Sequence, residues 1–502
     1  MALANKLING SGFSILNKLI SLAANILIVP ILIKGLGSSD YGFWLFLASF
    51  AGYFGLFSFG FTHELKNKVS MYSKDIKSLD ELISSVFTLF SFILLCFLSF
   101  FIIESFFEFD FFRSTFNDYD LSSDSYYVLL AFVGNVLFKV FSLSIYVNTL
   151  HGLGEVDATI RLDSFVSFIF NLCFLLFLYL FSFSLLDVAI FHCGRSVLSL
   201  VVFRYKLMKI QPRLKIRLSF KALNRLKELR KGGALFFLAS LLTAATSNLD
   251  FILISKMINY SEVTAFSLSQ KLFIVVSGAF PIAYISWPYF TENYFKDSKE
   301  KFNKRVHELI RLNFFLKSFF FCFCVLYYEL IIKLWIGDSF IQSLWVYLAF
   351  FLIYGLNTVF GIFSMLVSAT SNQLILLPVS TFSFVLNASF SIMFFFYFEK
   401  TILSIILGTL ISQVFLLFIW KYFLWKNLKV KVQVMKIITM MYPMLSFITL
   451  LCLLKLNDIN YQYNNFLSFI LLPFIIIFLY FSCIKSEERN AILKIIMKKV
   501  KK

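Results

Sequence analysis

Charged and polar side chains interrupt several long apolar stretches of this sequence, and four of them are spaced to act together. Arg195 lies one helical turn from His192 inside one such stretch, and Lys139 lies one turn from Asn135 inside another. A charge inside a membrane-spanning helix is costly unless it meets a partner or a water-filled cavity. Cationic groups beside hydrogen-bonding groups suit a pyrophosphate and the hydroxyls of a sugar chain, so we expect these residues to bind such a ligand.

Five other charged or polar residues lie in further apolar stretches. Lys18 and Asn25 share a face near the N-terminus, where Lys18 either contacts ligand or extends its ammonium to the membrane surface. Asp250 and Lys271 lie at similar distances from the turn of a predicted helical hairpin. They predict either a buried ion pair that fixes two helices, or a protonation site at Asp250 that couples transport to an ion while Lys271 meets the ligand. Lys317, near the inner end of its stretch, is expected to extend to the membrane surface.

The apolar stretches that carry these residues have the length of membrane-spanning helices. A bilayer core of ~30 Å needs about 20 apolar residues as helix, and none of the stretches alternates as barrel strands do. The candidate spans are residues 12–33, 41–61, 82–103, 126–147, 164–181, 186–203, 232–256, 263–290, 313–334, 343–367, 374–397, 402–425, 437–454 and 466–484. We therefore predict an all-α polytopic membrane protein with about 14 transmembrane helices, 12 being the alternative.

Basic residues set the expected orientation of these spans. With the N-terminus placed in the cytoplasm, 34 of the 46 Lys and Arg residues fall in cytoplasmic loops and only 4 in the opposite loops. Such an asymmetry in short loops is the positive-inside signal, so both termini are predicted to be cytoplasmic. The net charge of +18 follows from this topology, and the sequence shows no nucleic-acid-binding module.

A weak internal repeat predicts two pseudo-symmetric halves around a central cavity. A shift of 222 residues places Lys34 on Lys256 and Ser39 on Ser261, and the shifted spans keep the same orientation. Transporters are often built from such repeats, with the binding site between them. The predicted division is an N-terminal six-helix lobe at 1–205, a basic cytoplasmic linker helix at 206–231, a C-terminal six-helix lobe at 232–425, and two additional transmembrane helices with a basic tail at 426–502.

The predicted linker has an amphipathic pattern. After Ser219, a plausible helix cap, the apolar residues Ala222, Leu226 and Leu229 recur at helical spacing, and basic residues such as Arg225 occupy the other face. This pattern predicts either a helix that lies on the anionic inner leaflet and bridges the two halves, or a positively charged stop that only sets topology.

A stretch near the N-terminus carries a family resemblance. Between Leu32 and Ser70 it contains Gly35, Tyr41-Gly42, Trp44, Ser49, Phe59-Gly60 and Leu65-Lys66-Asn67-Lys68. With these residues the chain resembles bacterial polysaccharide flippases, the O-antigen (Wzx-type) transporters of the multidrug/oligosaccharidyl-lipid/polysaccharide exporter superfamily. It departs from them at Ser58 and His63, where relatives often carry an acid and an Asn, so no coupling role is transferred to that place.

The resemblance implies a function at the bacterial inner membrane. It implies that an undecaprenyl-pyrophosphate-linked oligosaccharide is moved from the inner to the outer leaflet by alternating access between two six-helix lobes. The lipid-linked oligosaccharide and membrane lipids are then the expected partners, and a polysaccharide polymerase and a chain-length regulator are candidate partners.

Two other classes of function fit the sequence less well. A multidrug extruder of the same superfamily would line its cavity with acids and aromatics, whereas Asp250 is the one deep acid in the predicted spans. A polysaccharide polymerase or ligase would carry catalytic residues on a large outer loop, and the longest predicted one is only residues 104–125. The sequence shows no catalytic or metal-binding pattern and suggests no cofactor, and its seven cysteines all lie within predicted spans.

Overall fold

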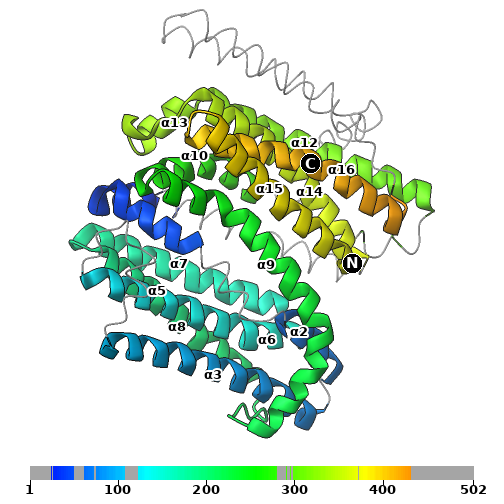
Figure 1. The fold of residues 1–502 in the computed structure, drawn as a ribbon. Coiled ribbons are helices and arrows are strands. Elements are labelled where there is room, and N and C mark those ends of the chain that lie inside the picture. Colours follow the sequence, from blue (N-terminus) through cyan, green and yellow to red (C-terminus); the bar gives the residue numbers. More distant parts are fainter. Residues whose placement is uncertain are drawn as a thin grey trace, which may run out of the picture. The chain divides into compact units, whose positions relative to one another are not determined.

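The computed structural model describes residues 24, 27–49, 61–72, 75–107, 123–279, 290, 294, 298–370 and 372–430. Within these residues the chain folds into helices and contains no strand (Figure 1). Nine helices in this part of the chain are long and apolar enough to cross a membrane. Contacts divide the protein into two compact units, Met1–Thr264 and Ala265–Lys502.

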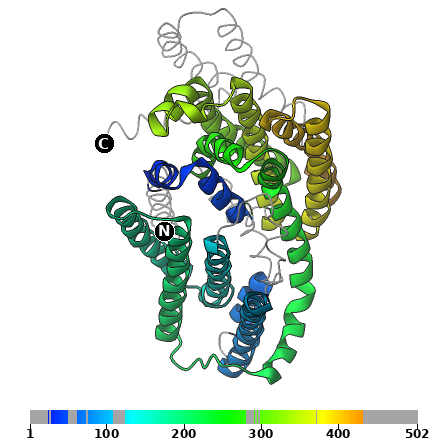
Figure 2. The ribbon, with the colours of Figure 1, turned by 60° about the vertical axis from the view of Figure 1, so that its left-hand side comes forward.

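The first unit is organised around helix α8. This helix (Leu185–Ile210) packs against both α5 (Ser123–Phe141) and α7 (Val156–Leu180). Residues 27–49 are helical on both sides of Gly37, whose φ of +84° interrupts the right-handed helix. The remaining elements are α2 (Phe61–Tyr72), α3 (Ile76–Phe107), the π-helical turn η2 (Ser142–Val147), α6 (Asn148–Gly152), the 3₁₀ turn η3 (Phe220–Arg225) and α9 (Leu226–Met257). Helix α9 is the long green helix that rises from η3 in both views (Figure 1, Figure 2).

The second unit is a series of neighbouring helices. Helix α15 (Leu376–Tyr397) packs on α16 (Ile402–Leu428), α16 on α14 (Leu344–Ala369), and α14 on α12 (Lys299–Leu326). The other elements are α10 (Tyr260–Ala279), which begins in the first unit, α13 (Tyr328–Trp335) and the 3₁₀ turns η4 (Asp338–Phe340) and η5 (Gln373–Ile375).

The predicted spans agree well with these helices. The nine apolar helices correspond to nine predicted spans, from the one at 82–103 to the one at 402–425. Helix α10 forms where the span at 263–290 is predicted, but it is not one of the nine, because polar side chains such as Ser267, Ser269 and Lys271 lower its hydropathy. The spans predicted at 437–454 and 466–484 lie outside the described residues, and those at 12–33 and 41–61 lie partly outside them.

Local signals explain where several helices begin. Ser184 caps α8 because its hydroxyl accepts the backbone N–H of Asp187, whose carboxylate in turn accepts the backbone N–H of Ser184. Ser298 caps α12 in the same way by accepting the N–H of Lys301. Each cap satisfies backbone donors that the first helical turn leaves unpaired, and so fixes the register of a long apolar helix.

Small and polar residues join α15 closely to α16. The hydroxyls of Ser391 and Thr409 both donate to Oδ1 of Asn387, each at 2.9 Å, and all three side chains are buried. A Cβ placed on Gly408 would lie 2.4 Å from Cα of Ser391, so only glycine fits at this crossing. Close approach through small residues, combined with buried hydrogen bonds, is the usual way in which membrane helices associate.

The segment between α8 and α9 corrects the prediction of a continuous linker helix over 206–231. Helix α8 ends at Ile210, and a turn at 212–213 follows. Residues 214–219 are then neither helix nor strand, with extended backbone at Ser219, and η3 precedes α9, which begins only at Leu226. Backbone N–H groups of this extended segment bond to side chains one turn apart on α3: Lys215 to Asp80, Arg217 to Ser84 and Ser219 to Thr88, at 3.0, 3.3 and 2.9 Å. The spacing of the donors matches the spacing of the acceptors. Four residues of helix rise ~6 Å, and two residues of extended chain span roughly 6.6 Å.

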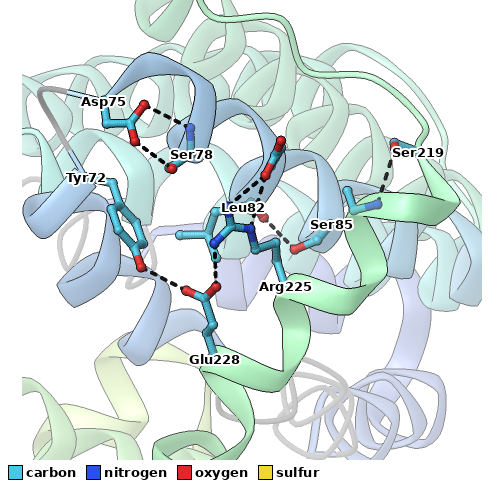
Figure 3. Close-up of polar contacts among 10 residues, drawn as sticks. Tyr72, Asp75, Ser78, Leu82, Ser85, Ser219, Arg225 and Glu228 are labelled. Atoms are coloured by element: carbon cyan, nitrogen blue, oxygen red, sulfur yellow. Dashed lines mark hydrogen bonds and ion pairs between the residues drawn. The ribbon is translucent and has the colours of Figure 1, made fainter.

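Charged groups close this segment onto α2 and α3 (Figure 3). Arg225 bonds to Glu81 of α3 at 2.9 Å and to Glu228 of α9 at 2.7 Å, and the hydroxyl of Tyr72 donates to Glu228 at 3.0 Å. The guanidinium of Arg225 holds the pKa of Glu228 below its usual value, and the bond to Glu228 raises the pKa of Tyr72. We call these four residues the linker clamp.

Two of the apolar residues of the predicted amphipathic helix are buried within the protein, and Leu226 is half-buried. Ala222 and Leu229 are 7% and 0% exposed. The sequence pattern therefore identified Ala222 and Leu229 correctly as buried positions, and protein covers both side chains.

Candidate functional site

Arg195 is oriented by contacts to a neighbouring helix. It lies near the middle of α8, and its guanidinium donates to the hydroxyl of Ser167 on α7 at 2.8 Å. The guanidinium also lies over the ring of Phe170, 5.0 Å from the ring centroid. A hydrogen bond on one edge and an aromatic ring on one face hold the charge in place while leaving other N–H groups to bind an anion.

His192 lies one turn before Arg195 and touches the same phenylalanine. Its ring centroid is 5.4 Å from that of Phe170, 5.2 Å from that of Phe174 and 5.3 Å from that of Trp44. The structure therefore places Arg195 and His192 on one face, as their spacing predicts. Trp44 belongs to the stretch that carries the family resemblance, so that stretch contributes directly to this cluster.

Asn135 and Lys139 reach the same region from α5. The hydroxyl of Ser196, the residue after Arg195, donates to Oδ1 of Asn135 at 2.6 Å. Lys139 follows one turn later with an exposed side chain, and its charge interacts with that of Arg195. The π-helical turn η2 begins three residues after Lys139, and π-helical turns occur frequently at functional sites.

An acid that is not among the predicted site residues completes the cluster. Asp163 lies one turn before Ser167 on α7, and its charge interacts with those of Arg195 and Lys139. Because the apolar run at 164–181 starts after it, the sequence predicts a cytoplasmic loop at this position. The span in the structure starts at Arg161, and the spacing from Asp163 to Ser167 is the signal that could have identified it.

We call Asn135, Lys139, Asp163, His192 and Arg195, with Ser167, the polar cluster of the first unit. It presents two cations against one carboxylate, with hydroxyl, amide and imidazole groups around them. Such a set can bind a phosphate through Lys139 and Arg195 and can hydrogen-bond sugar hydroxyls. Aromatic rings at Trp44 and Phe170 add apolar faces beside the charged groups.

Four other predicted site residues lie on other segments or outside the described residues. Lys18 and Asn25 lie outside the described residues. Asp250 is on α9 in the first unit, and Lys271 is on α10 in the second. Both take part in polar or electrostatic interactions, and the pairing predicted between them stays a prediction.

Within the described residues, no group of three or more His, Cys, Asp or Glu side chains could hold a metal ion. Cys322 and Cys324, the pair closest in sequence, are buried on α12. The sulfur of Cys324 contacts the backbone oxygen of Leu272 at 3.7 Å, as expected for a cysteine that fills apolar space.

Known proteins were compared with the chain by sequence and by fold. No protein-family model matches the sequence, and no curated protein matches it. Among solved structures, an inward-facing multidrug resistance MATE family transporter of the MOP superfamily is 14% identical with a TM-score of 0.58, covering 81% of this chain and 98% of its own. An outward-facing conformation of such a transporter is 15% identical with a TM-score of 0.55, covering 84% and 95%.

A third solved structure is a MOP superfamily transporter from Pyrococcus furiosus, in which reverse polarity of the binding pocket is said to suggest a different function. It is 14% identical with a TM-score of 0.53, and the match covers 84% of this chain and 93% of that one. At these identities the likeness shows the fold alone. The chain has the all-helical fold of MATE family transporters, and its several apolar helices make it a multi-pass membrane protein.

Proposed function

We propose that this protein is a flippase for a lipid-linked oligosaccharide. Its substrate is a repeat unit carried on undecaprenyl pyrophosphate, moved from the inner to the outer leaflet of the bacterial cytoplasmic membrane for O-antigen or capsule synthesis. The lipid carrier comes from the family resemblance. The observation that carries the proposal is the oriented guanidinium of Arg195, bonded to Ser167 and stacked on Phe170 within reach of the charge of Lys139.

The fold supports one part of the proposed mechanism, alternating access. MATE transporters of this fold have been solved in inward-facing and outward-facing conformations, which supports alternating access for this chain. The substrate diphosphate binds Lys139 and Arg195 during the cycle, with Lys18 and Lys271 as further contacts. Sugar hydroxyls bond to Asn25, Asn135 and His192. Protonation of Asp250 supplies the ion coupling, both termini are cytoplasmic, and a polymerase and a chain-length regulator receive the product.

A multidrug cation extruder is the second candidate, because two of the solved neighbours are multidrug resistance transporters. The polar cluster favours transport of an anionic substrate over transport of an organic cation. Lys139 and Arg195 outnumber Asp163, so an organic cation entering the cluster meets net repulsion, whereas a diphosphate meets attraction.

The test is a surface-polysaccharide gel from the host with this gene deleted and then complemented. The wild-type gene should restore a lost long-chain ladder, and Arg195→Met should not, although it reaches the membrane at normal level. The matched control is Arg204→Met, which removes an exposed arginine from the same helix and should restore the ladder. If deletion of the gene leaves the ladder unchanged and makes the cells sensitive to cationic dyes, the protein is a multidrug extruder and not a flippase.

A further inference from the structure

Lys317 lies inside the second unit, contrary to the expectation that it reaches the membrane surface. Helix α12 begins at Lys299, so Lys317 is about five turns into the helix. It is only 9% exposed and shares its helix face with the buried rings of Phe314 and Phe321. Among the residues that the structure describes, its ammonium has neither an ion-pair nor a hydrogen-bond partner.

Asn313 lies one turn before Lys317 and is 1% exposed. Its Nδ2 donates to the backbone oxygen of Thr358 on α14 at 3.3 Å, which fixes the amide against that helix. Its Oδ1 has no hydrogen-bond partner in the part of the chain that the structure describes. A buried acceptor without a donor costs about 1–3 kcal/mol, and a buried ammonium without a counter-charge costs more. Among the described residues, Oδ1 of Asn313 therefore lacks a donor, and the ammonium of Lys317, on the same helix face, lacks a counter-charge.

The same spacing occurs in the polar cluster of the first unit. There Asn135 accepts a hydrogen bond from Ser196 of α8, and Lys139 follows one turn later on α5. In the second unit Asn313 bonds to α14, and Lys317 follows one turn later on α12. In each unit an asparagine anchored to a neighbouring helix is followed by a lysine within a membrane-spanning helix.

We propose that Lys317 and Asn313 form a second binding position for a glycosyl diphosphate, on the second unit. This inference rests on the proposed function and specifies its substrate more closely. A phosphate oxygen neutralises the ammonium of Lys317, and a sugar hydroxyl donates to Oδ1 of Asn313. A ligand that satisfies both groups must carry a negative charge and a hydroxyl donor close together, as the junction of sugar and diphosphate does. An organic cation satisfies neither requirement.

The experiment measures binding to the purified full-length protein in lipid nanodiscs. Two probes are used, farnesyl diphosphate and the same lipid carrying one N-acetylglucosamine on its diphosphate. Lys317→Met should weaken binding of both probes by about 10- to 100-fold, the range expected for hydrogen bonds to charged groups. Asn313→Leu should weaken only the sugar-bearing probe, because farnesyl diphosphate offers no sugar hydroxyl.

Three control variants distinguish loss of the Lys317 charge from misfolding, and binding at Lys317 from binding at the polar cluster of the first unit. Lys421→Met removes an exposed lysine from α16 and should leave both affinities unchanged. Lys317→Arg keeps the charge and should retain most of the binding. If Lys317→Met does not fold, Lys317→Arg can still be compared with wild type. Arg195→Met measures how much the polar cluster of the first unit contributes to binding of the two probes.

The outcomes distinguish the two proposals. Wild-type affinity in Lys317→Met, with loss of binding in Arg195→Met, would overturn the second position and leave the proposed function intact. Equal weakening of both probes by Asn313→Leu would overturn its sugar-binding role. If the wild-type protein binds neither probe, the proposed function itself fails, and this inference fails with it.

Discussion

The guanidinium of Arg225 binds the carboxylate of Glu81 at 2.9 Å, although 144 residues separate them in the sequence. This contact fixes the start of α9 to α3, and the bond from Tyr72 to Glu228 fixes it to the end of α2. The segment between α8 and α9 is therefore fixed to the rest of the first unit. Backbone hydrogen bonds hold it along α3, and the linker clamp holds its end. Figure 3 shows the contacts of Arg225, Glu228 and Tyr72.

The linker clamp predicts a pH dependence of stability. The bond from Arg225 lowers the pKa of Glu228, so the contribution of this carboxylate is present at pH 7 and is lost as the pH falls through its lowered pKa, below the ordinary value of about 4.3. Glu228→Gln should lower the melting temperature at pH 7. The difference from wild type should shrink as the pH is lowered below about 4.

The expected size of this effect is modest. The side chains of Glu228 and Arg225 remain 27% and 34% exposed, so solvent screening limits the loss to about 0.5–1 kcal/mol. Thermal unfolding of the purified protein in detergent, measured at several pH values, provides the check. A difference between Glu228→Gln and wild type that does not change with pH would contradict this assignment.

The docking of the extended segment on α3 gives a second prediction. Ser84 and Thr88 accept the backbone N–H groups of Arg217 and Ser219, whereas the hydroxyl of Ser85 bonds within its own helix to Leu82. The double variant Ser84→Ala/Thr88→Ala should lower stability by about 1–3 kcal/mol, because two backbone donors lose their partners.

Ser85→Ala is the matched control and should have little effect, since it removes a hydroxyl of equal burial that supports no linker contact. Protease cleavage within residues 211–219 is a second readout and should accelerate only in the double variant. Equal cleavage rates in the double variant and the control would show that these bonds do not hold the segment.

Hydropathy predicts most of this fold because a lipid environment leaves few alternatives. An apolar stretch of about 20 residues must be helical to satisfy its backbone, so nine predicted spans coincide with helices in the described residues. The segment between α8 and α9 shows what hydropathy does not predict. Its apolar spacing at Ala222 and Leu229 correctly indicates burial, but spacing does not say whether lipid or protein covers the buried face.

The candidate site was predictable only within single helices. Spacing placed Arg195 with His192 and Asn135 with Lys139, because residues one turn apart share a face in any helix. The partners that orient these groups, such as Ser167 and Phe170 on α7, come from other helices. No local pattern specifies which helices become neighbours, so contacts of this kind, and the burial of Lys317, required the structure.

The crossing of α15 and α16 gives a third prediction. Gly408→Ala should destabilise the protein by about 1–3 kcal/mol, because the new methyl group would overlap the backbone of Ser391. Gly361→Ala is the matched control, a helix glycine on α14 with nothing within 4 Å of the added Cβ. It should leave the melting temperature unchanged or raise it slightly, through better helix propensity. Equal behaviour of the two variants would contradict the close crossing.

The contact between Ser167 and Arg195 gives the fourth prediction. If Ser167 orients the guanidinium, Ser167→Ala should weaken binding of farnesyl diphosphate by about 5- to 10-fold, because the charge remains but loses the hydrogen bond that holds it. Ser167→Thr keeps a hydroxyl and should bind nearly as well as wild type. Arg195→Met should weaken binding more than either.

The relation between these variants tests positioning separately from charge. In the double variant Ser167→Ala/Arg195→Met, the serine change should add almost nothing to the loss caused by the arginine change, because Ser167 acts through Arg195. If the two losses instead add fully, Ser167 contacts the ligand by itself or supports the helix pair of α7 and α8. A melting temperature close to that of wild type in Ser167→Ala would exclude the latter, since a packing role should alter the stability of the protein even without ligand.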